Sequence, residues 1–295
     1  MKVRIGIGGS LQGLSPSDLE VLCVGLIDRG FDSIWISEVL TQPGLDPLVS
    51  LGWLAGRLPT LKIGTTCLVP GRNLLRLARQ LATLDHLSGG RLLVTAVPGL
   101  PRGAERTAIG MEPKDRGHAI DQALPLLRSL LSGQATDVPG PIGVTPGVVL
   151  DPISHQQPLE FWLGGSLPSA LDRCGRLGDG WLPAMITPED AAEGRRRIEE
   201  IAASEGRSID PEHYGVSIGY SLNELPDAVR TALERRAPRG DVDRVVPVGA
   251  RALRSLLEAY LSVGFSKFVV RPLALSHGWD AELDALASAV GDLQT

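Results

Sequence analysis

The chain has 295 residues, of which 43% are hydrophobic and 21% are charged, and its formal net charge is −5. This composition is ordinary for a globular protein and excludes an intrinsically disordered chain, which combines low hydrophobicity with high net charge. The acidic balance lacks the clustered basic residues that nucleic-acid binding requires. Apolar runs are shorter than the ~20 residues of a membrane helix. The length suits one large α/β domain or two small ones.

The first elements alternate between strand and helix. Residues 3–8 are apolar and β-prone, and Ser15 followed by Pro16 indicates a helix start with Ser15 as the N-cap. That helix is expected to end at Gly30, and a short buried strand follows at 33–36. The alternation continues with strands expected at 62–67, 91–97, 159–163, 180–182, 214–220 and 267–271. Helices are expected at 46–58, 73–87, 114–131, 168–177, 188–204, 250–263 and 279–293.

These segments form about eight β-then-α units, and their strands are continuously apolar, as in a parallel sheet that is buried on both faces. Eight such units predict an α/β fold of the (β/α)8 TIM-barrel type. A doubly wound open sheet is the alternative, but the first turn, residues 6–10, lacks the GxGxxG spacing of that fold. The even composition predicts a single domain over 1–295, with excursions near 133–158 and 221–248 that cover the mouth of the barrel.

Cys23, Cys67 and Cys174 lie far apart and show no CxxC spacing. They predict neither a disulfide framework nor a zinc site, and no cluster of histidines or carboxylates predicts another metal. Because the chain opens directly on a strand-like segment, we expect no signal peptide and a cytoplasmic location.

In a barrel, the chemistry lies where the strands end at the carboxyl face. One such end is Gly164-Gly165-Ser166, just before a helix that starts near Pro168. Glycines allow a ligand close to the backbone, and free N–H groups at a helix start attract phosphate. A tight turn without any ligand explains the same residues equally well.

Ser37 and Glu38 end the second strand. A carboxylate in this place suits an acid, a base or a hydrogen-bond acceptor, whereas a loop carboxylate paired with an arginine is the alternative. Cys67 ends the third strand without an obvious basic neighbour, which favours packing over reactivity. Trp181 ends a very short strand and faces either the core or a ligand.

Three stretches carry more specific information. They are GFDSIWISE at 30–38, the segment 62–91 with its ATLDHLSGGR motif, and the segment 158–181 with its LGGS and LGDGW motifs. In this order they resemble the bacterial luciferase-like monooxygenase superfamily, and most closely its actinobacterial branch that uses coenzyme F420, a 5-deazaflavin.

The resemblance implies a (β/α)8 barrel with an insertion and with a flavin or deazaflavin across its carboxyl face. It implies a ring-backing segment with a non-proline cis peptide bond at Thr66–Cys67, and a second segment that touches the ribityl chain and the phosphate. The implied cofactor contacts are Ser37, Thr65, Thr66, Cys67, Val97, Gly99, Leu163, Gly164, Gly165, Ser166 and Trp181. We also expect a small-molecule substrate, a homodimer, and no nucleic-acid or membrane partner.

The chain departs from the family pattern at three places. Deazaflavin-dependent sugar and alcohol dehydrogenases of this family carry a histidine and a glutamate where this chain has Val39 and Leu100. Flavin-type members show a glycine-rich LGxGxG where this chain has VTAVPG at 94–99. Glu38 is therefore the ionisable side chain of its motif that is able to assist proton transfer.

The leading hypothesis is an oxidoreductase that transfers a hydride between F420 and a small organic substrate, with Glu38 as the catalytic residue. Two alternatives stay open. One is an FMN-dependent monooxygenase that works with a separate reductase, and the other is a degenerate barrel that binds a cofactor or metabolite without turnover.

Overall fold

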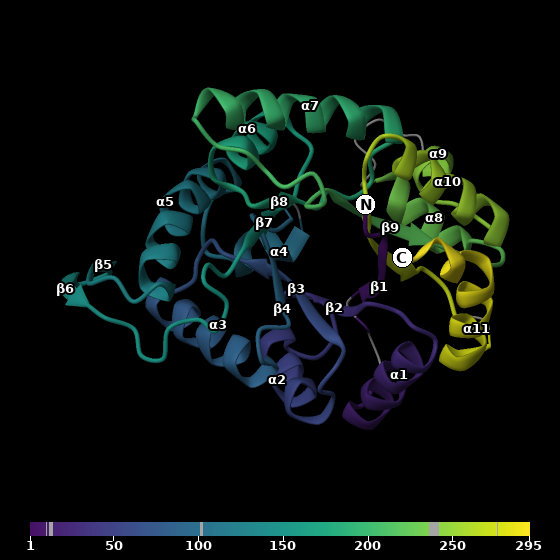
Figure 1. Cartoon of the computed structure of the whole chain (residues 1–295), viewed down its shortest axis with the longest axis horizontal. Coiled ribbons are helices and arrows are strands. Elements are labelled where there is room, and N and C mark those ends of the chain that lie inside the picture. Colours follow the sequence, from purple (N-terminus) through teal and green to yellow (C-terminus); the bar gives the residue numbers. More distant parts are fainter. Residues whose placement is uncertain (10, 12–13, 101–102, 236–241, 276) are drawn as a thin grey trace. The chain divides into compact units, whose positions relative to one another are not determined.

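The computed structural model describes residues 1–295 except 10, 12–13, 101–102, 236–241 and 276 (Figure 1). The strands are β1 (Arg4–Gly9), β2 (Ser33–Ser37), β3 (Lys62–Leu68), β4 (Leu92–Val97), β5 (Thr136–Gly140), β6 (Gly143–Val148), β7 (Phe161–Leu163), β8 (Gly180–Trp181), β9 (Gly215–Tyr220) and β10 (Lys267–Pro272). The helices are α1 (Pro16–Asp28), α2 (Pro47–Arg57), α3 (Leu74–Ser88), α4 (Gly103–Ala108), α5 (Pro113–Leu131), α6 (Pro168–Leu177), α7 (Pro188–Ser204), α8 (Asp227–Glu234), α9 (Val242–Val245), α10 (Ala250–Ser262) and α11 (Gly278–Val290), and a 3-10 turn, η1 (Gly291–Leu293), follows.

Hydrogen bonds join eight strands into one sheet in the order β8-β7-β4-β3-β2-β1-β10-β9. The pairs β1–β10, β10–β9 and β3–β4 are parallel. Two parallel bridges, Trp181 with Tyr214 and Ala184 with Ser217, connect the two ends of that order. The predicted (β/α)8 barrel is therefore confirmed, and the open sheet is excluded.

Contacts divide the chain into two compact units. The first comprises residues 1–9, 15–35 and 163–295, and the second comprises residues 10–14 and 36–162. The first unit contains β1, β8, β9 and β10 with helices α1 and α6 to α11, and the second contains β3 to β6 with helices α2 to α5. The single domain expected from the sequence stays a prediction.

Every strand and helix expected from the sequence for the barrel is present, with ends shifted by a few residues. The start of α1 forms a capping box: the Ser15 hydroxyl accepts a hydrogen bond from the Asp18 N–H (3.2 Å), and the Asp18 carboxylate accepts one from the Ser15 N–H (3.1 Å). The short helices α4 and α9 and the β5–β6 hairpin were not expected. The reason is that they are too short or lack the hydrophobic periodicity on which the sequence prediction relies.

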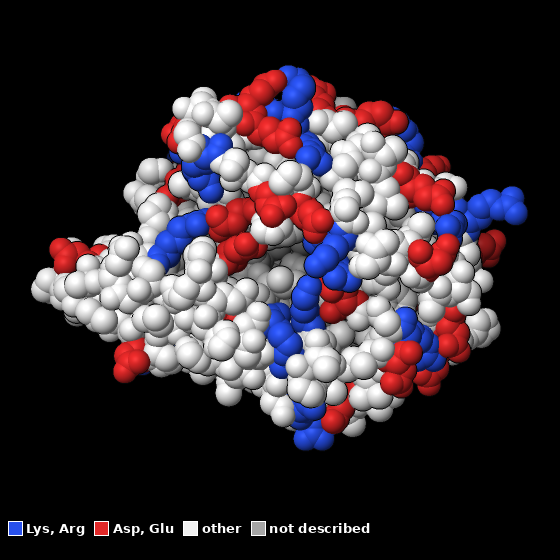
Figure 2. Space-filling model, in the orientation of Figure 1, with Lys and Arg blue, Asp and Glu red and all other residues white. Residues whose placement is uncertain are grey.

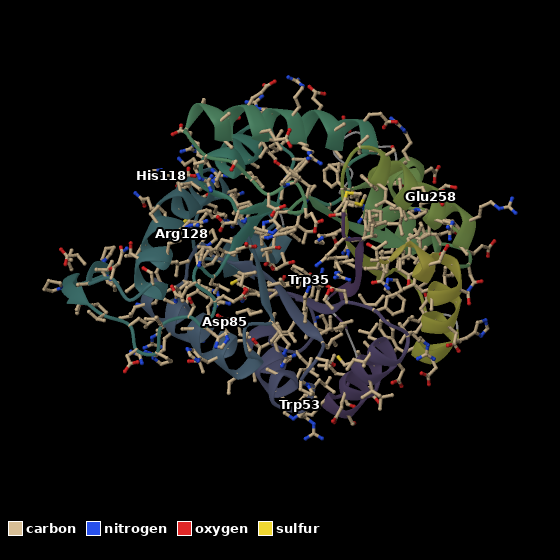
Figure 3. All side chains as sticks on the ribbon, viewed as in Figure 1. Trp35, Trp53, Asp85, His118, Arg128 and Glu258 are labelled. Atoms are coloured by element: carbon tan, nitrogen blue, oxygen red, sulfur yellow. The ribbon has the colours of Figure 1, made fainter. Side chains whose placement is uncertain are left out.

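The glycines of β1 make room for Trp35, which Figure 3 labels. A Cβ at Gly6 would lie 2.2 Å from the Ser33 hydroxyl oxygen, and a Cβ at Gly8 would lie 3.2 Å from the Trp35 Cβ and 2.4 Å from a Val269 methyl carbon. The Trp35 indole N–H donates to the Ser33 hydroxyl at 3.0 Å. The glycine-rich first strand therefore serves packing, in agreement with the absence of dinucleotide-type spacing.

The ATLDHLSGGR motif ties α3 to the segment that precedes β7. Asp85, labelled in Figure 3, is fully buried, and its two carboxylate oxygens accept hydrogen bonds from the backbone N–H and the side-chain amide of Gln156, both at 2.7 Å. The His86 Nε2 atom lies 2.8 Å from the carbonyl oxygen of Ile153. These contacts give the motif a structural role.

Arg91, the last residue of the motif, holds three backbone carbonyl groups. Its guanidinium donates to the carbonyl oxygens of Ser88 (2.6 Å), Ala55 (3.1 Å) and Leu61. The planar fork of an arginine can reach several carbonyls at once. Arg91 therefore joins the end of α3 to the end of α2 and the start of β3.

The first excursion, residues 133–158, forms an antiparallel hairpin of β5 and β6. β5 contacts α5, and the hairpin projects away from α3 and α5 at the left of Figure 1. Its tip residue Ile142 is fully exposed. A covering role for residues 133–158 at the barrel mouth stays a prediction.

The second excursion, residues 221–248, follows the carboxyl end of β9 directly. It closes through hydrogen bonds from the Ser221 N–H to the Pro247 carbonyl (3.1 Å) and from the Gly249 N–H to the Ser221 carbonyl (2.8 Å). Its buried residues Leu225, Leu233, Val242, Val245 and Val246 pack against Met185 and Leu273. Since Leu273 follows the end of β10, this excursion packs beside the end of that strand. Its role as a cover over the barrel mouth stays a prediction, and residues 236–241 lie outside the described part of the chain.

On the face shown in Figure 2, the Lys and Arg side chains alternate with Asp and Glu side chains. None of the helices in the described part of the chain combines the length and the apolar character needed to cross a membrane.

We predict that Asp85→Ala lowers the free energy of unfolding by about 2–4 kcal/mol, because two part-buried donors of Gln156 lose the buried, charged acceptor that they share. Asp137, an exposed carboxylate that accepts from the Gly147 N–H at 2.8 Å, provides the control, and Asp137→Ala should change stability by less than about 1 kcal/mol. Urea unfolding of both variants measures the difference. Equal losses would contradict the structural role of the motif.

Candidate functional site

Glu38 follows β2 directly, and its side chain is 7% exposed. Its Oε2 accepts a hydrogen bond from the backbone N–H of Leu68 at 2.8 Å, and its Oε1 pairs with the Arg72 guanidinium. Each oxygen of the carboxylate thus accepts from one N–H donor. Of the two interpretations that the sequence left open, the structure shows the pairing with an arginine.

Arg72 and Glu38 together hold the end of β3. The Arg72 Nε donates to the Leu68 carbonyl oxygen at 2.8 Å, while Glu38 accepts from the N–H of the same residue. The Glu38 N–H in turn donates to the Thr66 carbonyl at 2.9 Å. Because a buried carboxylate requires a paired charge, the ion pair fixes the ends of β2 and β3 to each other.

A cavity of about 210 Å³ lies beside this ion pair. Ser37 and Glu38 form part of its wall, and the rest comes from the β2–α2 loop. The lining loop residues are Val39, Leu40, Gln42, Pro43, Gly44, Leu45, Asp46 and Pro47. Glu38 therefore lies in a pocket wall, whether or not it takes part in chemistry.

The short helix α4 holds the same loop through Glu105. This carboxylate is 3% exposed and accepts hydrogen bonds from the Thr41 hydroxyl (3.1 Å) and the Leu40 N–H (3.4 Å). The sequence analysis missed Glu105 because a single acidic residue in an unpredicted six-residue helix gives no periodic signal. Its contact with a loop 64 residues earlier is visible in the fold alone.

Arg116, in α5, binds the backbone of the residues around α4. Its guanidinium, in a side chain that is 1% exposed, donates to the carbonyl oxygens of Leu100 (2.8 Å), Arg106 (2.9 Å) and Met111 (3.0 Å). Leu100, which stands at the glutamate position of the family pattern, is thus held by its backbone while its side chain is exposed. Arg116 thus fixes the backbone of this segment, and Leu100 supplies no carboxylate at that position.

The predicted cofactor contacts Thr65, Thr66 and Cys67 lie in a regular part of β3, in register with Val94, Thr95 and Ala96 of β4. The expected cis peptide bond at Thr66–Cys67 is wrong: the cis bonds of the described residues are Asp151–Pro152 and Gln157–Pro158. The parallel register runs unbroken through Cys67 to Leu68, which requires extended trans backbone. The hydroxyl groups of Thr65 and Thr95 are buried without a hydrogen-bond partner among the described residues.

Cys67 is a packing residue, as the sequence predicted. Burial is the main cause that raises the pKa of its thiol to about 12, and the nearby Arg72 lowers it by less. The thiolate, which is the reactive form, is therefore scarce at neutral pH. The described cysteines are all free and buried, and no three His, Cys, Asp or Glu side chains in the described part of the chain are grouped to hold a metal ion.

Val97 and Gly99 end the fourth strand. Gly99 has a φ of +76°, and a Cβ there would lie 2.5 Å from a carbon of Ile109 and 2.8 Å from a carbon of Leu68. The glycine is therefore required by the turn and by the close approach of the residues that follow α4.

Leu163 to Ser166 form the turn between β7 and α6. Gly165 has a φ of +94°, a conformation that favours glycine, and a Cβ there would lie 3.1 Å from the Ala170 Cβ. The N-terminus of α6 has no side-chain cap from any described residue. Pro168 has no N–H, and the Ala170 and Leu171 N–H groups both donate to the Leu167 carbonyl (2.8 and 3.0 Å), which leaves the Ser169 N–H at this end for solvent or for an anion.

Trp181 contacts this turn. Its side chain is almost fully buried, and its indole N–H donates to the Gly165 carbonyl at 2.8 Å. The tryptophan is thus buried and bonded to the backbone of the turn, and it also forms part of the wall of the groove described next.

A groove of about 720 Å³ begins at the turn and runs between α6 and α7, which lie side by side at the top of Figure 1. Ser166, Leu171 and Ile201 line it together with charged residues of both signs. Its arginines are Arg196, Arg197 and Arg244, and each pairs with a carboxylate, at 2.6, 2.6 and 3.0 Å respectively. These pairs are substantially exposed, so they are weak and able to exchange partners.

The model of the luciferase-like monooxygenase family matches residues 6–262. The chain belongs to this family. A similar relative is the F420-dependent glucose-6-phosphate dehydrogenase of Kineococcus radiotolerans, 28% identical over 193 residues that make up 61% of this chain and 56% of the relative. The match thus spans little more than half of that relative's length, and it supports the F420-dependent branch that the sequence motifs indicated.

Solved structures agree with this luciferase-like fold. An F420-dependent secondary alcohol dehydrogenase, in complex with an F420–acetone adduct, superimposes with a TM-score of 0.83 at 18% identity and full coverage of both chains. The FMN-bound oxygenating constituent of 3,6-diketocamphane monooxygenase from Pseudomonas putida gives a TM-score of 0.76 at 14% identity, over 100% of this chain and 99% of that chain. At these identities both likenesses concern the fold alone.

The predicted site residues of this luciferase-like protein fall into two groups. The unit that contains β3 and β4 includes Ser37, Glu38, Thr65, Thr66, Cys67, Val97 and Gly99. The other unit includes Leu163, Gly164, Gly165, Ser166 and Trp181. Within the first group, Glu38 and Arg72 join the strand ends. Within the second, Trp181 joins the strand end to the turn.

We predict that Glu38→Gln lowers the free energy of unfolding by about 1–3 kcal/mol, because the half-buried Arg72 loses its counter-charge and Leu68 loses a charged acceptor. Glu112, whose exposed pair with Arg106 spans 2.9 Å, gives the matched control, and Glu112→Gln should cost less than about 0.5 kcal/mol.

A double-mutant cycle with Arg72→Met tests the same pair. The double variant should lose less stability than the sum of the two single variants, because one ion pair is removed only once. Strict additivity in urea unfolding would contradict the coupling of Glu38 and Arg72.

Proposed function

We propose that this protein is an oxidoreductase that transfers a hydride between coenzyme F420 and a small organic substrate. Bound F420 supplies the carbon centre that accepts or donates the hydride, and the protein's task is to bind, orient and exclude water. The observation that carries the proposal is the Gly164–Ser166 turn, which has a left-handed glycine and an uncapped helix start and which opens into a groove.

These residues fit a cofactor with a phosphate that carries a further chain. Backbone N–H groups at the start of α6 suit a phosphate. The groove of about 720 Å³ continues from Ser166 and is lined by three arginines and by the carboxylates of Asp190, Glu193 and Glu200. The phosphate of F420 carries an oligoglutamate tail, whereas FMN ends at its phosphate, so the space in the groove, and not its balanced charge, favours F420.

In this proposal, Leu163, Gly164, Gly165 and Ser166 hold the ribityl chain and the phosphate, and Trp181 acts on their backbone. Ser37, Thr65, Thr66, Cys67, Val97 and Gly99 form the wall against the ring. The hydroxyls of Thr65 and Thr95 are buried and lack a hydrogen-bond partner among the described residues. This supports a polar group of the ligand beside these two strands. The homodimer and the cytoplasmic location expected from the sequence stay predictions.

Both oxygens of Glu38 already accept hydrogen bonds, so the side chain must release the Arg72 guanidinium or the Leu68 N–H before either oxygen can take part in proton transfer. We propose that Glu38 moves a proton at Oε1, the oxygen that faces the more exposed partner, Arg72, whose side chain is 23% exposed.

Turnover of the Glu38→Gln variant tests this role. With a catalytic carboxyl, the variant keeps its affinity for F420 but loses turnover by about 100-fold or more. Unchanged turnover would assign the proton to solvent or substrate and leave Glu38 as a bracing group.

We predict that the protein binds F420 at least about tenfold more tightly than FMN, a difference of about 1.4 kcal/mol. Titration of the full-length chain with each cofactor, followed by quenching of cofactor fluorescence and by calorimetry, measures it. Equal or tighter binding of FMN would replace this proposal with the monooxygenase alternative. Tight binding of F420 without hydride transfer to any aldehyde, ketone or alcohol tested would indicate the degenerate barrel.

A further inference from the structure

We propose that Trp181 is the positioning residue of the phosphate site: its indole N–H holds the Gly165 carbonyl and thereby turns the Ser166 N–H toward the cofactor's phosphate. The inference rests on the proposed function, which assigns the phosphate to this turn. In this proposal the Trp181 side chain does not contact the phosphate itself. It acts through the peptide group between Gly165 and Ser166.

The backbone of Trp181 is fixed from both sides. Its N–H donates to the His213 carbonyl at 2.9 Å, just before β9, and the N–H of Leu182 donates to the Leu163 carbonyl at 2.9 Å, at the end of β7. The same strand end that carries Leu163 leads into the turn. The distance from Trp181 to the turn is therefore set by the sheet itself.

The indole ring is also held in place. It packs against Phe265 with a ring-centroid distance of 5.8 Å, and its outer edge meets α7 at Gly194. A Cβ at Gly194 would lie 2.4 Å from the Trp181 Cη2, so glycine is required for the ring to fit. Because the ring is confined on these sides, it cannot shift with the turn. The position of the ring therefore sets the position of the Gly165 carbonyl.

The rest of the LGDGW motif supports this placement. Arg207 donates to the carbonyl oxygens of Gly175 and Gly178, both at 2.8 Å, and the His213 Nδ1 atom lies 3.0 Å from the Asp179 carbonyl oxygen. A Cβ at Gly178 would lie 2.9 Å from the Cys174 carbonyl oxygen. The motif thus forms a rigid connection from α6 to Trp181, which explains its residues without any contact to a ligand.

The chemistry of the indole decides which way the peptide faces. An indole has an N–H donor and no acceptor, so it can bind the Gly165 carbonyl but not the Ser166 N–H. In a planar trans peptide the carbonyl and the following N–H point in opposite directions. With the Gly165 carbonyl on Trp181 (2.8 Å), the Ser166 N–H points away from the ring.

The Ser166 N–H donates to no backbone carbonyl among the described residues. It lies one residue before Leu167, the N-cap of α6, and that cap has no side-chain hydrogen bond. The N–H therefore adds to the partial positive charge of the helix start. A side chain able both to donate and to accept, such as tyrosine, would permit the flipped peptide, with the Gly165 carbonyl facing the phosphate.

The test compares ligands with and without the phosphate in the Trp181→Phe variant, which keeps an aromatic ring and removes the N–H. F420 is compared with the 5-deazaflavin riboside that lacks the phosphate and the tail. We expect affinity for F420 to fall by roughly tenfold, the effect of about one hydrogen bond, and affinity for the riboside to change by less than about twofold. Gly194→Ala, which displaces the ring and keeps the N–H, should give the same phosphate-specific loss.

Trp35→Phe is the matched control, since it also removes a buried indole N–H bond, the one of 3.0 Å to Ser33. It should leave the ratio of the two affinities unchanged. Equal losses for both ligands in Trp181→Phe, or no loss for F420, would overturn the inference. If the wild-type chain fails to bind F420 but binds FMN, the proposed function fails, and FMN against riboflavin then decides the role of Trp181 by the same ratio.

Discussion

Backbone carbonyl groups at the ends of strands and helices need hydrogen-bond donors, and in this chain guanidinium groups supply many of them. Arg91 and Arg116 each hold three carbonyls, and Arg207 holds two. The strands are continuously apolar and offer few polar side chains as hydrogen-bond donors. The carbonyl groups of the connecting segments therefore depend on long arginine side chains. Only four of the 29 cationic residues are lysines, and a lysine ammonium has no planar fork to serve several carbonyls.

The same principle organises the predicted site, with different groups in its two halves. At the end of β3, a charged pair holds both backbone groups of Leu68: Glu38 takes the N–H and Arg72 takes the carbonyl. At the turn after β7, a neutral donor, the indole of Trp181, holds the carbonyl of Gly165. A charge-assisted bond is the stronger of the two, whereas a confined ring gives the more definite direction. Both arrangements fix backbone at strand ends, where a barrel places its chemistry.

Much of the fold was predictable because the barrel repeats one local pattern. Each apolar strand and each amphipathic helix carries its own signal, and the N-cap at Ser15 appears in the structure as expected. What the sequence could not give were contacts between distant segments. Glu38 and Arg72 are 34 residues apart, and Glu105 reaches Thr41 from a helix without hydrophobic periodicity. The orientation of Trp181 was equally hidden, because a buried indole and a ligand-facing indole have the same neighbours in sequence.

The geometry of Glu38 also changes the question that the sequence posed. From the sequence, Glu38 was either a residue for proton transfer or a carboxylate paired with an arginine. The structure shows the pair, and both carboxylate oxygens already accept hydrogen bonds, from the Leu68 N–H and from Arg72. The proposed role of Glu38 in proton transfer therefore requires Oε1 to separate from Arg72 first. An anionic group of a ligand that draws the guanidinium away would free this oxygen, so the ion pair would link ligand binding to any chemistry at Glu38.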